Sequence, residues 1–266
     1  MIKLEDIQEI ALSAGEIIRK YFYEDVQVNY KSDETPVTIA DVKTNEFLKE
    51  RLNKLMPEAH WLSEEDKDNE ERLDQEYVWV VDPLDGTQSF VEKMPELAVS
   101  VALLKNGVPF IGAVYNPITR QGGFYNGFTE ELKFIGFEKR KAVEKIESAK
   151  IVVSRSEFIH RKINEFFKEF PHIKPVGSVA NKLMKIAGGS EDFYYSVHPK
   201  SEWDIAGGVA LLQAVGKKYV RFDNQPLIFN QDKPIVDSGS VAGSDILLDQ
   251  FFKEYPHLIK TIRREN

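Results

Sequence analysis

The residues of this chain that could do chemistry are mostly carboxylates, and two of them stand three residues apart in the segment 80–87. Asp82 and Asp85 flank a bend, and Gly86 and Thr87 follow with a permissive backbone and a hydroxyl. Carboxylates held this close repel one another unless a cation neutralises them, and Mg²⁺ prefers such oxygen ligands. Backbone N–H groups in the following turn can hold an anion. The segment therefore offers both halves of a metal-dependent phosphate site, although an ordinary Asp-Pro/Asp-Gly turn would need no chemistry.

Three further carboxylates are candidates for the same site: Asp41, Glu64 and Asp204. Asp41 ends the pattern Thr38-x-x-Asp41, which is also that of a capping box. The two roles are compatible, since a capped helix start is a rigid place to mount a carboxylate. Asp204 also falls at an expected helix start, where capping and chemistry both stay open. Glu64 either reaches the site from a short strand or belongs to the solvated loop that follows it.

Hydrophobic spacing predicts the elements that must position these residues. An amphipathic helix is expected over residues 3–22, and a second one is expected after Asp41 and before Pro57. The apolar run 77–81 predicts a buried strand that stops at Asp82, because the following proline cannot continue a central strand. The other strands expected in this part of the chain cover residues 60–62, 97–104, 108–115, 122–125 and 132–137.

From residue 151 onward, strands and helices alternate, which is typical of an α/β half. One helix is expected to carry the apolar residues between 158 and 167, and another should run from Ser178 to Gly188. The remaining expected elements are strands at 151–153, 193–195, 219–222 and 240–242 and helices at 202–216 and 246–255. We expect an N-terminal α+β half, 1–145, with an antiparallel sheet and most metal motifs, closely joined to an α/β half, 146–266, as one catalytic unit.

Composition narrows the class of protein. The chain has 266 residues, 42% hydrophobic and 29% charged, as in an ordinary globular protein with a substantial core. The net charge of −8 argues against binding to nucleic acid polymers or membranes, and no apolar run is long enough to span a bilayer. The absence of cysteine excludes disulfides and thiolate chemistry, and serine-elbow, P-loop and zincin motifs are also absent. We expect a cytoplasmic monomer or homodimer that acts on a small molecule.

Four motifs resemble those of the lithium-sensitive, Mg²⁺-dependent phosphatase superfamily of inositol monophosphatases, bisphosphate nucleotidases and fructose bisphosphatases. They are PVTIAD at 36–41, SEED at 63–66, WVVDPLDGT at 79–87 and EWDIAG at 202–207. The motifs fall in family order, and the resemblance covers essentially the whole chain. It implies a layered αβαβα sandwich of mixed α+β and α/β character, and sensitivity to lithium.

The resemblance also implies a role for each site residue. The metal ligands, for two or three Mg²⁺ ions, would be Glu64, Asp82, the carbonyl of Leu84, Asp85 and Asp204. The catalytic residues would be Glu64, Asp41 and Thr87, the last two orienting and deprotonating a metal-bound water. The substrate contacts would be Gly86, Thr87, Ser156, Ser178, Lys182 and Asp204, with the amides of Gly86 and Thr87 on the phosphate. Such a two-metal site needs no covalent nucleophile.

Shorter motifs indicate the substrate. Inositol monophosphatases carry a Glu after a tyrosine pair to contact inositol hydroxyls, whereas Ser196 follows Tyr194 and Tyr195 here. The segments around Ser156 and Lys182 resemble bacterial-type 3'(2'),5'-bisphosphate nucleotidases, although Lys182 could also be an exposed helix lysine. We expect a phosphomonoesterase that converts 3'-phosphoadenosine 5'-phosphate to AMP and phosphate. Two alternatives stay open: an inositol-1-monophosphatase or broad sugar-phosphate phosphatase, and a catalytically silent regulator that binds metal and phosphate.

Overall fold

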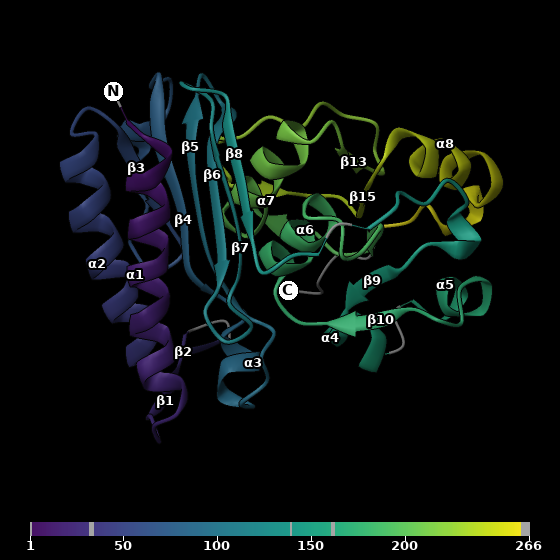
Figure 1. The fold of residues 1–266 in the computed structure, drawn as a ribbon, viewed down its shortest axis with the longest axis horizontal. Helices are drawn as coiled ribbons and strands as arrows, with labels where there is room; N and C mark the ends of the chain where they lie inside the picture. The colour runs from purple at the N-terminus through teal and green to yellow at the C-terminus, as the bar shows by residue number, and fades with distance from the viewer. Residues whose placement is uncertain (1, 32–34, 139, 161–162, 262–266) are drawn as a thin grey trace.

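Five layers of helix and sheet are stacked in this protein (Figure 1). The structure, a computed structural model, describes residues 2–31, 35–138, 140–160 and 163–261. α1 (Leu4–Phe22) and α2 (Ile39–Leu55) form one outer layer, and α6 (Val179–Ala187) and α7 (Glu202–Ala214) lie between the two large sheets. The predicted αβαβα sandwich is confirmed. In the described part of the chain, no helix combines the length and apolar character needed to cross a membrane.

The first large sheet has six strands in the order β3-β4-β5-β6-β7-β8, antiparallel except for the pair β3 and β4. α1 and α2 cover one of its faces, and α7 covers the other. Asn106 and Gly107, at the turn between β5 and β6, both have positive φ, as an Asn-Gly hairpin turn requires. The strands are β3 (His60–Ser63), β4 (Tyr77–Asp85), β5 (Ala98–Lys105), β6 (Val108–Asn116), β7 (Gln121–Asn126) and β8 (Glu131–Ile135).

β4 is longer than the sequence predicts, because it continues through Pro83 to Asp85. Its register against β5 shifts between Asp82 and Asp85, so the ladder is irregular where the proline stands. An irregular ladder needs no hydrogen bond from the proline nitrogen, which is why the strand tolerates it. The prediction that the strand stops at Asp82 is therefore wrong. Both carboxylates stand in the sheet and not in a loose turn.

The second large sheet has five strands in the order β10-β9-β11-β15-β13. Its outer side is covered by α8 (Asp245–Glu254) and by the short helix α5 (Asn164–Glu169), and another short helix, α4 (Arg155–Ile159), follows the strand that ends at Ser154. The strands are β9 (Ile151–Ser154), β10 (Lys174–Val176), β11 (Phe193–Ser196), β13 (Lys218–Arg221) and β15 (Ser240–Gly243). Smaller elements are the pairs β1 (Val28–Tyr30) with β2 (Pro36–Thr38) and β12 (Lys200–Ser201) with β14 (Ile235–Val236), the helix α3 (Thr87–Val91), and 3-10 turns at Glu70–Arg72, Ile146–Ser148 and Pro256–Leu258.

The single helix expected between residues 158 and 167 is instead two short ones. α4 ends at Ile159, and the backbone of Ile163 is not helical (φ −117°) before α5 begins. Ile159 is exposed whereas Ile163 and Phe166 are buried, so the apolar residues do not share one helix face. The helical spacing of the apolar residues therefore gave a wrong prediction of one continuous helix. Residues 161 and 162, within the expected helix, lie outside the described residues.

Buried apolar side chains fill the spaces between the layers. Ile7, Leu48 and Val81 belong to a group between the outer helices and the first sheet. A second group joins Val80 of the first sheet to Tyr194 of the second through the helices between them. The two large sheets therefore share a core. The division of the chain into halves at residue 145 stays a prediction.

Small residues let α7 lie directly against the first sheet. A Cβ on Gly112 of β6 would stand 2.6 Å from Cβ of Ala210 and 2.7 Å from the carbonyl oxygen of Gly207, both in α7. A Cβ on Gly207 would stand 2.8 Å from Oγ of Ser100 in β5. Packing this dense leaves no room for a side chain unless the helix moves. The contact fixes the start of α7, with Asp204, relative to β4.

We predict that Gly112→Ala destabilises the protein by about 1–3 kcal/mol, because the added methyl group overpacks the contact between β6 and α7. The measurement is urea-induced unfolding. Val108→Ala on the same strand is the control; Val108 is 54% exposed, and we expect a change within about 0.5 kcal/mol. Equal stabilities of the two variants would show that α7 can leave the sheet at little cost.

Candidate active site

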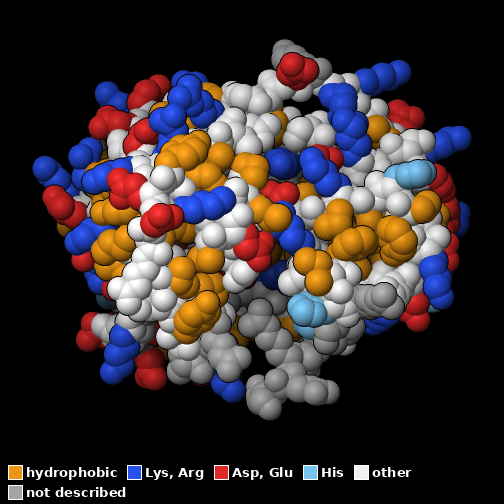
Figure 2. All heavy atoms as spheres, turned by 90° about the horizontal axis from the view of Figure 1, so that it is seen from below, with side chains coloured by type: hydrophobic (Ala, Val, Ile, Leu, Met, Phe, Trp, Pro, Cys, Tyr) orange, Lys and Arg blue, Asp and Glu red, His pale blue; other side chains and the backbone are white. Residues whose placement is uncertain are grey.

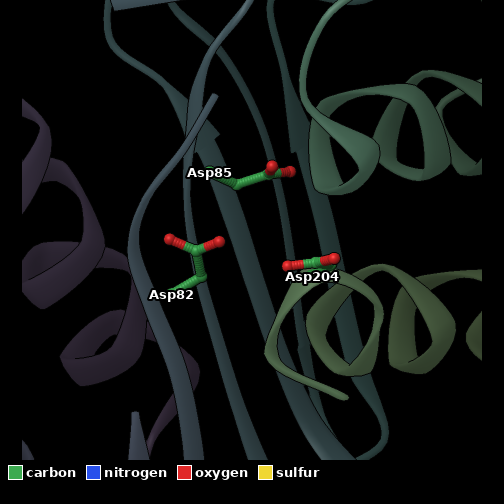
Figure 3. A group of neighbouring side chains, drawn as sticks. All are labelled: Asp82, Asp85 and Asp204. Atoms are coloured by element: carbon green, nitrogen blue, oxygen red, sulfur yellow. The ribbon is translucent and has the colours of Figure 1, made fainter. Parts of the chain in front are cut away.

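Three carboxylates meet where β4 ends and α7 begins (Figure 3). One oxygen from each of Asp82, Asp85 and Asp204 lies within 4.8 Å of the other two. Asp82 Oδ1 accepts the backbone N–H of Leu84 at 2.9 Å, and Asp204 Oδ2 accepts that of Ser201 at 3.2 Å. Asp204 is thus both a capping residue of α7 and a member of the cluster. The structure brings together three of the five predicted metal ligands.

Burial raises the pKa of all three carboxyl groups, and repulsion among the acids, including Glu64, adds to it. The pKa of Asp204 rises to about 8, and that of Asp82 lies well above its ordinary value. Each of the three keeps one oxygen that accepts no hydrogen bond from the described residues: Asp82 Oδ2, Asp85 Oδ1 and Asp204 Oδ1. Hard oxygen donors that are buried, close together and mutually repelling fit a divalent cation such as Mg²⁺.

Glu64 lies near this cluster but is turned toward a lysine. Its Oε1 is 2.9 Å from Nζ of Lys31, which also lies 2.7 Å from Oε1 of Glu65. Burial alone would lower the pKa of Lys31, but the two glutamates outweigh it and the net shift is upward. Glu64 contributes to the raised pKa values of the cluster, so it is within electrostatic reach. The predicted role of Glu64 as a metal ligand stays a prediction. Its contact with Lys31 was not predicted, because only the charge of Lys31 could have indicated it in the sequence.

Asp41 and Thr87, from segments far apart in the chain, meet beside the cluster. Thr87 Oγ1 lies 2.9 Å from Asp41 Oδ1 and 3.1 Å from the carbonyl oxygen of Leu84. The other oxygen of Asp41, Oδ2, accepts both the N–H and the hydroxyl of Thr38 at 2.7 Å. Asp41 therefore caps α2 and also faces Thr87. Burial raises its pKa, partly opposed by these hydrogen bonds, and its predicted part in catalysis stays a prediction.

A cleft of about 520 Å³ runs past Asp85 and Asp204. Residues of α3 and α4 are among those that line it. Figure 2 shows the face of the molecule seen from below in Figure 1, where acidic and basic side chains lie between groups of hydrophobic ones. The predicted substrate contacts that line the cleft are Gly86, Ser156, Ser178, Lys182 and Asp204. Lys182 is buried, because α6 packs between the sheets, so an exposed helix lysine is excluded. Burial lowers its pKa to about 7.

Sequence reasoning missed a buried ion pair beside the cleft. Nζ of Lys200, which lines the cleft, lies 3.3 Å from Oε1 of Glu157. The same carboxylate accepts the hydroxyl of Ser196 at 2.5 Å and the N–H of Val197 at 3.0 Å. No local pattern could have revealed this ion pair, since Glu157 and Lys200 are 43 residues apart.

Comparison with known proteins agrees with this fold. A model of the inositol monophosphatase family matches residues 3–253. The 3'(2'),5'-bisphosphate nucleotidase CysQ of Aggregatibacter actinomycetemcomitans is 32% identical over 260 residues, 94% of this chain and 96% of that protein. CysQ of Buchnera aphidicola is 35% identical over 227 residues, 81% of this chain and 83% of that protein. The crystal structure of CysQ from Bacteroides thetaiotaomicron has a TM-score of 0.71 and 28% identity, covering 91% of this chain and 96% of that one.

The layered fold with its acidic cluster therefore defines a phosphatase. The chain belongs to the inositol monophosphatase family. The predicted family and the predicted enzyme class are both confirmed.

We predict that Asp204→Asn stabilises the metal-free protein at pH 8 but not at pH 4. A carboxyl group whose pKa is raised by folding stabilises the folded state below its unfolded pKa, and that contribution is lost as pH rises toward the folded value of about 8. Each pKa unit corresponds to about 1.4 kcal/mol, so we expect a gain of at least that size at pH 8. The measurement is the unfolding free energy in EDTA at both pH values.

Asp249→Asn, on the exposed face of α8, is the matched control for loss of one negative charge. It should leave the pH dependence of stability as in the wild type. A gain from Asp204→Asn that is the same at pH 4 and pH 8 would show that repulsion in the cluster is not the cause.

Proposed function

We propose that this phosphatase is a Mg²⁺-dependent 3'(2'),5'-bisphosphate nucleotidase that converts 3'-phosphoadenosine 5'-phosphate to AMP and phosphate. One observation carries the proposal: the cleft that starts at the carboxylates of Asp85 and Asp204 also has exposed apolar side chains on its wall. Its volume of about 520 Å³ is in the range of small-molecule sites. The names of the similar CysQ proteins support the same substrate.

The apolar part of the cleft includes Ile159 at the end of α4, Ile235 in β14, and Pro199, together with Val179. Ile159 is 63% exposed and Ile235 is 53% exposed, so neither serves the core. β14 pairs with β12, which places Ile235 beside Ser201 at the start of α7. A flat purine gains free energy by covering such side chains, whereas inositol, hydroxylated on every carbon, gains much less.

The residue after the tyrosine pair gives a second argument against inositol. Ser196 is fully buried, and its hydroxyl donates to Glu157. The Glu157 carboxylate is itself neutralised by Lys200. Neither Ser196 nor Glu157 therefore supplies a free carboxylate that could accept hydrogen bonds from inositol hydroxyls.

The proposed chemistry divides between the metal and the chain. Two or three Mg²⁺ ions would be held by Glu64, Asp82, the carbonyl of Leu84, Asp85 and Asp204; when bound, they acidify a water and neutralise phosphoryl oxygens. The Thr87 hydroxyl donates a hydrogen bond to Asp41 Oδ1, which leaves a lone pair on Thr87 Oγ1 to accept a hydrogen bond from the attacking water. The raised pKa of Asp41 makes it a better proton acceptor.

We predict that kcat/KM with Mg²⁺ is about a hundredfold higher for 3'-phosphoadenosine 5'-phosphate than for inositol-1-phosphate, about 2.7 kcal/mol of discrimination. The measurement is phosphate release from each compound. Asp85→Asn is the control for contaminating phosphatases and should lose turnover by about a thousandfold or more, because it removes a charged ligand. The reverse preference would identify an inositol phosphatase, and no release from either compound by a chain that still binds Mg²⁺ would favour the silent binding protein.

We predict that Ile159→Ser and Ile235→Ser each lower kcat/KM for the nucleotide about tenfold and leave that for inositol-1-phosphate within about twofold. The physical reason is loss of the apolar surface that the base covers. Ile246→Ser, in α8 and 52% exposed, is the matched control and should change neither value. Equal losses for both substrates would show that the isoleucines do not contact a base.

A further inference from the structure

The carboxylate of Asp85 is held on one side by the start of α6. Its Oδ2 accepts the hydroxyl of Ser178 at 2.6 Å and the backbone N–H of Ala180 at 2.6 Å. These two donors occupy Oδ2 and leave Oδ1, the oxygen without a hydrogen bond from the described residues, on the other side of the group. Two bonds to one oxygen fix the plane of the carboxylate as well as its position.

The hydroxyl of Ser178 is fully engaged in this arrangement. It has one proton, which it donates to Asp85, and it accepts the backbone N–H of Asn181 at 3.0 Å as the cap of α6. Ser178 is also buried. A serine whose proton is used in a hydrogen bond to a buried carboxylate has no proton left to donate to a substrate phosphate. Its lone pair would repel the phosphate oxygens.

The backbone at Ser178 is strained, with φ +53° and ψ +118° in a residue that is not glycine. The turn that contains it is held from two sides. Gly177 N–H donates to Oε2 of Glu96 at 2.6 Å, and Nζ of Lys182 donates to the carbonyl oxygens of Val176 and Gly177 at 2.9 and 3.3 Å. These three hydrogen bonds can hold the strained residue in place, and they keep the hydroxyl of Ser178 directed at Asp85.

We propose that Ser178 is a positioning residue for the metal site, which orients Asp85 so that Oδ1 faces the cation, and that it is not a substrate contact. Lys182 supports it by bracing the turn. This inference rests on the proposed metal-dependent chemistry but not on the identity of the substrate. Hydrogen bonds to metal-binding carboxylates commonly decide the affinity and geometry of a site.

The test is calorimetric titration of the metal-free full chain with Mg²⁺ alone, alongside steady-state kinetics. Ser178→Ala should weaken Mg²⁺ binding by about 10–100-fold. At saturating Mg²⁺, its KM for whichever of the two phosphomonoesters the enzyme hydrolyses should stay within about twofold of wild type. A raised KM at saturating Mg²⁺ with unchanged Mg²⁺ affinity would instead make Ser178 a substrate contact and overturn the proposal.

Ser178→Gly separates the hydroxyl from the strain, because glycine adopts positive φ freely. It should weaken Mg²⁺ binding as Ser178→Ala does, while its melting temperature stays above that of the alanine variant. Wild-type Mg²⁺ affinity in Ser178→Gly would show that the hydroxyl is dispensable and overturn the proposal. Ser190→Ala, just after α6, removes a hydroxyl that bonds only Lys185 O at 3.4 Å among the described residues, and it should bind Mg²⁺ like the wild type.

The same titration separates this inference from the proposed function. If the wild-type chain binds no Mg²⁺, the metal-dependent function fails and takes the role of Ser178 with it. If the wild-type chain binds Mg²⁺ and Ser178→Ala binds it equally well, only the role of Ser178 fails.

Discussion

Three like charges within 4.8 Å of one another are the constraint on which this structure depends. Asp82, Asp85 and Asp204 are buried, and burial together with repulsion raises the pKa of each. Such a cluster opposes folding at neutral pH unless a cation joins it. Loops would let the carboxylates move apart, so the chain mounts two of them in a sheet strand and the third in the first turn of a buried helix. This rigid frame keeps the three carboxyl groups close together, and in the proposed function a divalent cation would relieve their repulsion.

Two contacts between the first sheet and the central helices keep this frame together. α7 lies against β6 because Gly112 and Gly207 have no side chains, and this sets the depth of Asp204. α6 is tied to β4 through Ser178 and Asp85, which are 93 residues apart in the chain. The acidic cluster therefore exists only when α6 and α7 are packed on the first sheet.

Two basic side chains that line the cleft, Arg155 and Lys200, are paired with acids. Lys200 pairs with Glu157, and Arg155 with Glu96. Burial lowers the pKa of Lys182 to about 7, and its ammonium group donates to backbone carbonyls. The described basic residues that line the cleft therefore supply little positive field for a phosphorylated substrate. In the proposed function that field comes from the bound cations, so metal binding and substrate binding depend on each other.

The sequence by itself determined the family, the order of most elements and the carboxylates that form the site, because these depend on local spacing and on short motifs such as WVVDPLDGT at 79–87. The tertiary structure alone decided that β4 passes through Pro83, that Lys182 is buried, and that Ser196 faces Glu157. It also decided which oxygen of Asp85 accepts the hydrogen bonds of Ser178 and Ala180. The physical reason is that burial and hydrogen-bond partners are set by residues far away in the chain, and a local pattern contains no record of them.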